Sequence, residues 1–165
     1  MSDAAKKTAA TPGLGTTLAS IVNGCFGDYL SQRDNGLAID MAFYRNNRPL
    51  PLTPETLREA FPAPTSKLCV LVHGLCCHEG AWDYPDNPAR SYGSALQDDL
   101  GYTPFFLRYN TGLPIPYNGT ALDALLEKLL AAYPLDAEEL VLVGHSMGGL
   151  VLRGACHFGA ERGAT

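Results

Sequence analysis

Apolar runs and helical stripes alternate along the chain from Lys67 onward. Runs with the length and composition of buried strands cover residues 67–72, 103–109 and 139–144. Segments with helical periodicity follow them, over residues 90–100, 122–130 and 147–158. A strand and then a helix, three times over, predicts an α/β fold in which right-handed βαβ units build a parallel sheet with flanking helices.

The middle helical segment has the clearest stripe. Its leucines recur at i, i+3, i+4, i+7 and i+8 and are Leu122, Leu125, Leu126, Leu129 and Leu130. Asp123, Glu127 and Lys128 lie on the predicted polar face, and the pattern stops at Pro134. Because each buried leucine contributes about 1.5–3 kcal/mol of transfer free energy, we interpret the stripe as core packing rather than a partner-binding surface.

The start of the chain has weaker patterns. Residues 1–15 are small and polar without periodicity, which predicts a disordered leader. Residues 16–30 are predicted to form a short helix. The rest of the chain, residues 16–165, is then one partial α/β domain.

A hairpin-like start to that domain is predicted before the first buried run. Residues 37–44 alternate apolar and polar positions as a strand does, Asn46-Asn47 favours a turn, and residues 48–52 return as a short partner strand. Thr53 then caps a helix that ends before Pro62.

Composition narrows the function classes. With 165 residues, 46% apolar and 18% charged, the chain is typical of one soluble globular domain. A net charge of −5 with scattered Lys and Arg argues against a nucleic-acid partner. Since no apolar run reaches the length of a membrane helix, no membrane span is predicted. A cytoplasmic location is expected, because polar and helix-breaking residues interrupt any export signal in residues 11–17.

The spacing of the cysteines and histidines predicts neither a disulfide framework nor a metal site. The five cysteines lack regular spacing. Cys69 and Cys156 are predicted to pack as small hydrophobic residues, and Cys76-Cys77 to be two thiols in a loop. A metal site at His73, His78 and Glu79 is disfavoured by the spacing, so neither a metal nor a cofactor is predicted.

The most specific motif is V-L-V-G-H-S-M-G-G-L at residues 141–150. It joins an apolar strand to a helical segment through G-x-S-x-G, the pattern of a nucleophile elbow that lifts a serine hydroxyl from the edge of a sheet. Gly144 and Gly148 are needed because side chains two positions from Ser146 would clash with the strand or helix that the turn joins.

A second motif, His73-Gly74-Leu75, directly follows the apolar run at residues 67–72. A loop after this strand places a backbone N–H near the serine of an elbow. The N–H groups of Leu75 and Met147 are therefore candidates for an oxyanion hole.

Together these motifs make residues 37–158 resemble the α/β-hydrolase superfamily, in particular bacterial lipase-like and esterase-like members. The resemblance implies that Ser146 is a nucleophile acting on carboxylic esters, lipids among them, through an acyl-enzyme. It implies that Leu75 and Met147 supply the oxyanion hole. It also implies that the backbone of the elbow and of the loop is held in place by His73, Gly74, Gly144, His145 and Gly148. Asn110, Thr111 and Gly112 would line an acyl pocket on the same rim.

The chain departs from that family in its triad. The acid and the histidine of the family lie after later strands, but the only candidates after Ser146 are His157 and Glu161. His157 follows Ser146 by eleven residues, about 16 Å along a helix, which is too far to act as its base. His145, His73 and His78 are also poor candidates for the base.

Two hypotheses follow. In the first, the chain is the N-terminal part of a serine ester hydrolase, truncated after the elbow helix and not competent by itself. In the second, it is a non-catalytic protein that binds a hydrophobic ligand or a partner. The strand Leu140–Val143 is apolar on both faces with nothing after it to cover its outer edge, so self-association through that edge is expected.

Overall fold

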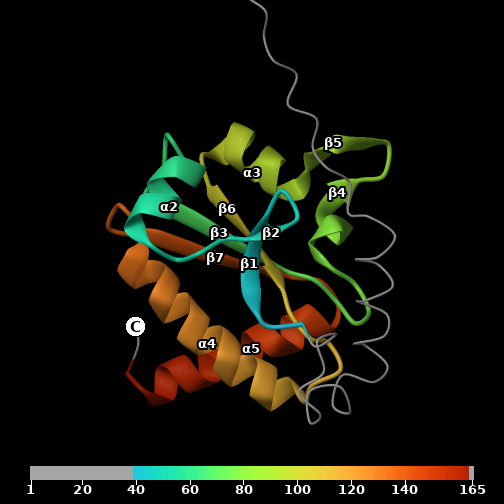
Figure 1. Ribbon diagram of the computed structural model, residues 1–165. Helices are drawn as coiled ribbons and strands as arrows, with labels where there is room; N and C mark the ends of the chain where they lie inside the picture. The colour runs from blue at the N-terminus through green and yellow to red at the C-terminus, as the bar shows by residue number, and fades with distance from the viewer. Residues whose placement is uncertain (1–38, 164–165) are drawn as a thin grey trace, which may run out of the picture.

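A five-stranded sheet forms the centre of the molecule in the computed structural model, which describes residues 39–163 (Figure 1). The strands lie in the order β2-β1-β6-β3-β7. Their bounds are β1 Ala42–Arg45, β2 Arg48–Pro49, β3 Lys67–Val72, β6 Thr103–Arg108 and β7 Glu139–Gly144. β3 is parallel to β6 and to β7, whereas β1 is antiparallel to β6 and to β2. The predicted α/β class and its three parallel strands are confirmed.

Helices cover both faces of this sheet. They are α2 Pro54–Ala60, α3 Tyr92–Leu100, α4 Ile115–Ala132 and α5 Met147–Glu161. α4 and α5 lie side by side on one face, and α3 lies on the other (Figure 1). Alternate residues of β3 divide between the two cores: Leu68, Val70 and Val72 join the larger cluster, and Cys69 and Leu71 the smaller one beneath α3. All five are fully buried.

The start of the described chain is the predicted hairpin in a shorter form. β1 and β2 pair across Asn46 and Asn47, whose φ angles of 51° and 59° put both in the left-handed region that Asn tolerates. β1 begins at Ala42, and β2 spans two residues because Pro49 and Pro51 cannot donate to a ladder. The predicted leader and the predicted helix at residues 16–30 lie outside the described residues.

The N-terminus of α3 corrects one prediction. We expected this helix to begin at Arg90, but residues 87–91 form strand β5, which pairs with β4 (Asp83–Tyr84) after the short 3₁₀ helix η1 (Glu79–Trp82). Ser91 begins α3 through a capping box in which its hydroxyl accepts from the Ser94 N–H at 3.0 Å and its N–H donates to Ser94 Oγ at 2.9 Å.

The leucine stripe of α4 is only partly core. Leu122 and Leu129 are fully buried, but Leu130 is 42% exposed, which contradicts its predicted burial. Asp123, expected on the polar face, is buried and forms an ion pair with Arg162 at 2.6 Å. Asp123 lies one turn after Gly119, where α4 and α5 cross so closely that a β-carbon on Gly119 would lie 3.1 Å from the Gly154 Cα.

One of the two cysteines predicted to be in the core is buried and the other is exposed to solvent. Cys69 is buried as predicted, whereas Cys156 is exposed on the outer face of α5, contrary to its predicted packing in the core. α5 buries Val151, Leu152 and Ala155 instead, and position 156 follows them onto the solvent side of the helix.

β7 is the outermost strand of the sheet on the side away from the hairpin. The four residues Leu140–Val143 are half-buried, although their partners in β3 are fully buried. Within residues 39–163, no strand pairs with the outer edge of β7.

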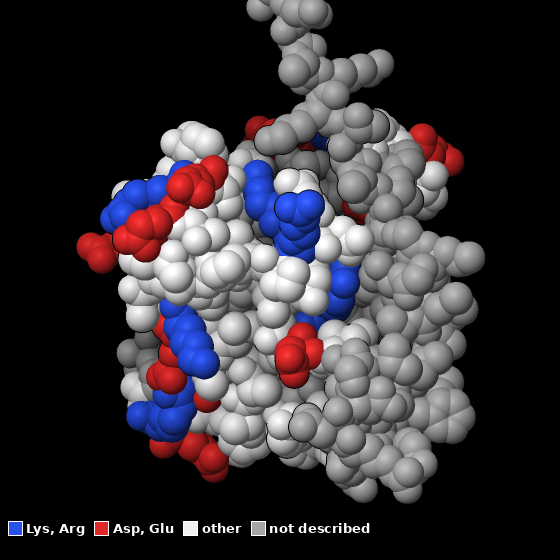
Figure 2. Space-filling model, viewed as in Figure 1, with Lys and Arg blue, Asp and Glu red and all other residues white. Residues whose placement is uncertain are grey.

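Charged side chains lie in separate groups on the face in view. Figure 2 shows basic and acidic side chains next to one another over α2 and beside α4, and basic side chains near one another over the β1–β2 hairpin in the middle of the view. None of the described helices combines the length and the apolar character needed to cross a bilayer.

Candidate active site

Ser146 occupies the turn between β7 and α5. Its φ of 54° and ψ of −123° are strained for a residue with a side chain, as a nucleophile elbow requires. The neighbouring His145 N–H donates to the Val72 carbonyl at 3.0 Å, which fixes the turn to the end of β3. Ser146 is exposed, so its hydroxyl is accessible at the carboxyl edge of the parallel strands.

Two glycines make this turn possible by close approach. A β-carbon on Gly144 would lie 2.7 Å from the Gly149 Cα, and one on Gly148 would lie 2.2 Å from the Val72 carbonyl oxygen. Both distances are shorter than van der Waals contact, so the steric argument made from the G-x-S-x-G spacing agrees with the packing.

The loop after β3 lies directly beside the elbow. A β-carbon on Gly74 would lie 3.0 Å from Ser146 Cβ and 3.2 Å from His145 Nδ1. Leu75 follows with a half-exposed side chain. The segments that carry the two candidate oxyanion donors, Leu75 and Met147, therefore meet at Ser146, which is the arrangement that such donors need.

His73 supports this loop from inside. It is fully buried, its ring stacks on Tyr109 with centroids 4.6 Å apart, and its Nδ1 donates to the Gly74 carbonyl at 3.0 Å. Burial lowers the pKa of His73 to about 4, so the imidazole is neutral near neutral pH. Its Nε2 is buried and has no hydrogen-bond partner within residues 39–163, so the ring packs as part of the core.

Residues after β6 hold the loop from the other side. The Tyr109 hydroxyl donates to the His73 carbonyl at 2.8 Å, and the Cys76 N–H donates to Thr111 Oγ1 at 3.1 Å. Asn110 is buried, with its carbonyl accepting from the Asn118 amide at 3.0 Å. Thr111 thus braces the loop, whereas Asn110 joins the end of β6 to α4; the acyl pocket expected at Asn110, Thr111 and Gly112 stays a prediction. Sequence reasoning missed Tyr109, although its place at the end of an apolar strand was a usable signal.

An ion pair behind the loop was also missed. The Arg108 guanidinium contacts both carboxylate oxygens of Glu79, donates to Asn47 Oδ1 at 2.6 Å, and stacks 3.8 Å over the Tyr44 ring. Arg108 and Glu79 are 29 positions apart in sequence, so no local pattern pairs them. The network ties η1, which follows the His73 loop, to β6 and the β1–β2 turn.

A comparison with known families matches residues 69–162, more than half of the chain, to the model described as the alpha/beta hydrolase family. The chain belongs to this family. The matched segment begins in β3 and ends at α5, so it includes both the loop at His73 and the elbow at Ser146. Comparisons with curated proteins and with solved structures found no match.

Three histidines of this α/β hydrolase, His73, His78 and His157, make contacts away from the Ser146 hydroxyl. His78 caps η1, where its Nδ1 accepts from the Gly80 N–H at 3.0 Å. His157 lies on the solvent side of α5, 3.5 Å from Glu161. Among residues 39–163, no histidine is hydrogen-bonded to Ser146, and no group of three or more metal-ligating side chains comes together.

Proposed function

We propose that Ser146 is the nucleophile of a serine hydrolase centre that acts on carboxylic esters. The observation that carries the proposal is the exposed Ser146 hydroxyl in a left-handed turn, with the backbone of Gly74 packed against it. In the reaction, Oγ attacks the ester carbonyl carbon, a base takes the Oγ proton, and the alcohol leaves. Water then releases the acid from the acyl-enzyme.

The negative charge of the tetrahedral intermediate would rest on the N–H groups of Leu75 and Met147. Each such donor is worth about 2.7–4 kcal/mol in the barrier when it is preorganised. The anchors on the loop, from Tyr109 and Thr111, supply that preorganisation, since they fix the backbone on both sides of Leu75.

An apolar cavity lies between α3 and the sheet and favours a second candidate function, a non-catalytic protein that binds a hydrophobic ligand or partner. The cavity has a volume of about 300 Å³ and is bounded by Leu71, Trp82, Leu96 and Val143. Neither Ser146 nor the His73–Leu75 loop lines it, so it is separate from the proposed hydrolase centre.

With no histidine hydrogen-bonded to Ser146 among residues 39–163, we expect this chain by itself to hydrolyse esters very slowly, because an unassisted serine is a weak nucleophile. The elbow and the oxyanion donors would still direct a reactive ester to Ser146. Adding a base from solution therefore separates the two candidate functions.

The test is acylation by p-nitrophenyl acetate with and without imidazole, followed by peptide mass mapping. We expect slow acetylation of Ser146 that imidazole accelerates, and no corresponding adduct in Ser146→Ala. Acetylation spread over surface lysines such as Lys128, with no preference for Ser146, would reject the nucleophile. Rapid labelling of Ser146 by a fluorophosphonate without imidazole would instead show that a base is already present.

A further inference from the structure

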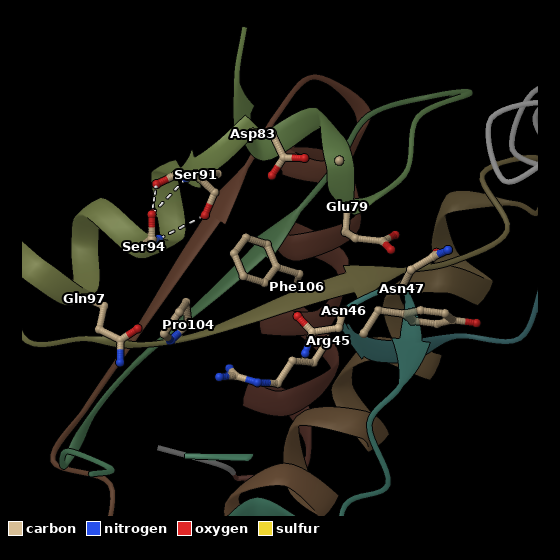
Figure 3. Close-up of a pocket in the computed structure, with 13 residues that line it drawn as sticks. Arg45, Asn46, Asn47, Glu79, Asp83, Ser91, Ser94, Gln97, Pro104 and Phe106 are labelled. Atoms are coloured by element: carbon tan, nitrogen blue, oxygen red, sulfur yellow. Dashed lines mark hydrogen bonds between the residues drawn. The ribbon is translucent and has the colours of Figure 1, made fainter. Parts of the chain in front are cut away.

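A second cavity lies on the other side of α3 from the apolar one, toward the β1–β2 hairpin. Its volume is about 350 Å³, which lies within the range of small-molecule pockets. The β1–β2 turn, η1, the β4–β5 hairpin and α3 surround it, and Phe106 and Pro104 of β6 form its floor (Figure 3). None of the residues of the elbow or of the His73–Leu75 loop lines it, so it is separate from the proposed hydrolase centre.

The floor of this cavity is aromatic and its sides are polar. Gly93 brings α3 so close to β6 that a β-carbon there would lie 2.4 Å from the Phe106 ring. Beyond Phe106, the wall is formed by the polar turn at Asn46 and Asn47 instead of a helix. A ligand here would therefore meet an apolar ring below and polar groups at the rim.

No cationic side chain of the described residues points into the cavity. Arg45 is among the lining residues, but its guanidinium lies 4.5 Å over the Phe61 ring. Phe61 packs against Phe105, with ring centroids 5.0 Å apart. Because successive residues of a strand point to opposite faces of the sheet, Phe105 and the Arg45 guanidinium lie on the face away from Phe106.

One carboxylate on the wall is already neutralised. Glu79 lines the cavity, but Arg108 contacts both of its oxygens, so this pair contributes little net charge toward a ligand. The Ser91 and Ser94 hydroxyls are engaged in the capping box that Figure 3 shows by dashed lines.

The Asp83 carboxylate is the charge that remains uncompensated. It extends into the cavity between Ser91 and Glu79 (Figure 3), and no cationic side chain within residues 39–163 forms an ion pair with it. Burial and the neighbouring Glu79 raise the pKa of Asp83, so a bound cation would relieve an existing penalty. The cavity thus combines an excess of negative charge with an aromatic floor.

We propose that this cavity binds a small organic amine, with its ammonium group at Asp83 and its apolar stem across Phe106. An ammonium group donates up to three hydrogen bonds and also packs favourably against an aromatic ring. A hydrated metal ion fits less well, because it needs oxygen ligands where Phe106 and Pro104 form the floor. The amine accounts for a half-buried carboxylate that faces an apolar surface without a cationic partner in the described chain.

The test uses 2-phenylethylamine as the amine, 2-phenylethanol as a neutral probe of similar shape, and 3-phenylpropanoate as an anionic probe. Binding is measured by calorimetry near neutral pH and at low ionic strength, where exposed charges are least screened. We expect the amine to bind at least about ten-fold more tightly than either other probe, because a charge-assisted hydrogen bond adds to the apolar contact. Equal affinities for the amine and the alcohol, or no binding of the amine, would overturn the proposal.

Variants place the ammonium group. Asp83→Asn should reduce the affinity for 2-phenylethylamine to about that for 2-phenylethanol, and unchanged binding of the alcohol would show that the cavity is intact. Asp86→Asn is the matched control, at an exposed position between β4 and β5 and outside the cavity, and should keep the wild-type affinity. Equal losses in these two variants would show a nonspecific charge effect and reject the site.

Ser146→Ala separates this site from the proposed hydrolase centre. The variant should bind 2-phenylethylamine as the wild type does, since Ser146 does not line the cavity, whether or not Ser146 is a nucleophile. A loss of amine binding in Ser146→Ala would place the amine at the elbow and reject the site at Asp83.

Discussion

The Gly148 Cα packs against the carbonyl oxygen of Val72, so closely that a β-carbon at Gly148 would lie 2.2 Å from that oxygen. The contact joins the first turn of α5 to the last residue of β3. It therefore fixes the distance between the elbow that carries Ser146 and the loop that begins at His73. The geometry of the candidate site depends on a residue that has no side chain.

Gly148→Ala should lower the free energy of unfolding by about 2 kcal/mol or more, because the added methyl group meets backbone that cannot move aside. Urea unfolding measures the change. Gly149→Ala is the matched control: a β-carbon there meets nothing within 4 Å, so the better helix propensity of alanine should raise stability by up to about 1 kcal/mol. Equal effects at the two positions would contradict the packing described.

Glu79→Gln should cost about 3 kcal/mol of stability, because it leaves the Arg108 charge without its carboxylate partner at a site where the two side chains are only 10% and 13% exposed. Chemical denaturation provides the measurement. Glu161→Gln serves for comparison. The side chains of His157 and Glu161 are 65% and 63% exposed, so this substitution should change the free energy of unfolding by no more than about 0.5 kcal/mol. A small loss for Glu79→Gln would mean that water reaches Arg108 readily.

Stability should fall as the pH is lowered from about 6.5 to about 4. Burial lowers the pKa of His73 to about 4, whereas the same histidine in the unfolded chain titrates near 6.5. Between those values the unfolded chain binds a proton that the folded chain does not, so the free energy of unfolding decreases by up to about 3 kcal/mol. Burial lowers the pKa of His78 too, which adds to the decrease, while the raised pKa of Asp83 opposes it in the acid part of the range.

Urea unfolding at several pH values checks this dependence. His73→Gln should remove most of it, and His157→Gln, at an exposed position, should leave it as in the wild type. The same dependence in all three proteins would show that His73 is not its source and would contradict the lowered pKa of His73.

The outer edge of β7 should cause self-association that increases with protein concentration in size-exclusion chromatography. Because the His145 N–H faces β3 and alternate residues of a strand face the same neighbour, the Leu142 N–H faces away from β3. Leu142→Pro removes that donor and should reduce association. Leu142→Ala loses similar apolar contacts but keeps the donor, and should associate as the wild type does. A wild-type protein that stays monomeric at all concentrations would contradict the prediction.

Segments with a strong local pattern were predicted well. The strand at Glu139–Gly144 and the start of α5 at Met147 are as predicted. The apolar run favours an extended backbone, and the G-x-S-x-G pattern favours a tight turn into a helix. The predicted start of α3 at Arg90 was wrong, since Arg90 and Ser91 belong to strand β5, which pairs with β4. Pairing with a distant segment overrode local propensity there.

Side-chain environments were harder to predict than elements. Leu130 continues the leucine stripe yet is exposed, and Cys156 lies on the solvent side of α5. Periodicity shows which face of a helix is apolar. How much of that face is buried depends on how the neighbouring helix crosses it, and α4 and α5 cross at Gly119 and Gly154.

The sequence by itself determined the elbow, because the glycines around Ser146 and the apolar strand before it restrict the backbone locally. Only the tertiary structure decided what surrounds it: the Tyr109 and Thr111 contacts that hold the loop, and the Arg108–Glu79 ion pair behind it. These join residues far apart in the chain, and their partners follow from strand order and helix packing, which no short stretch of sequence encodes.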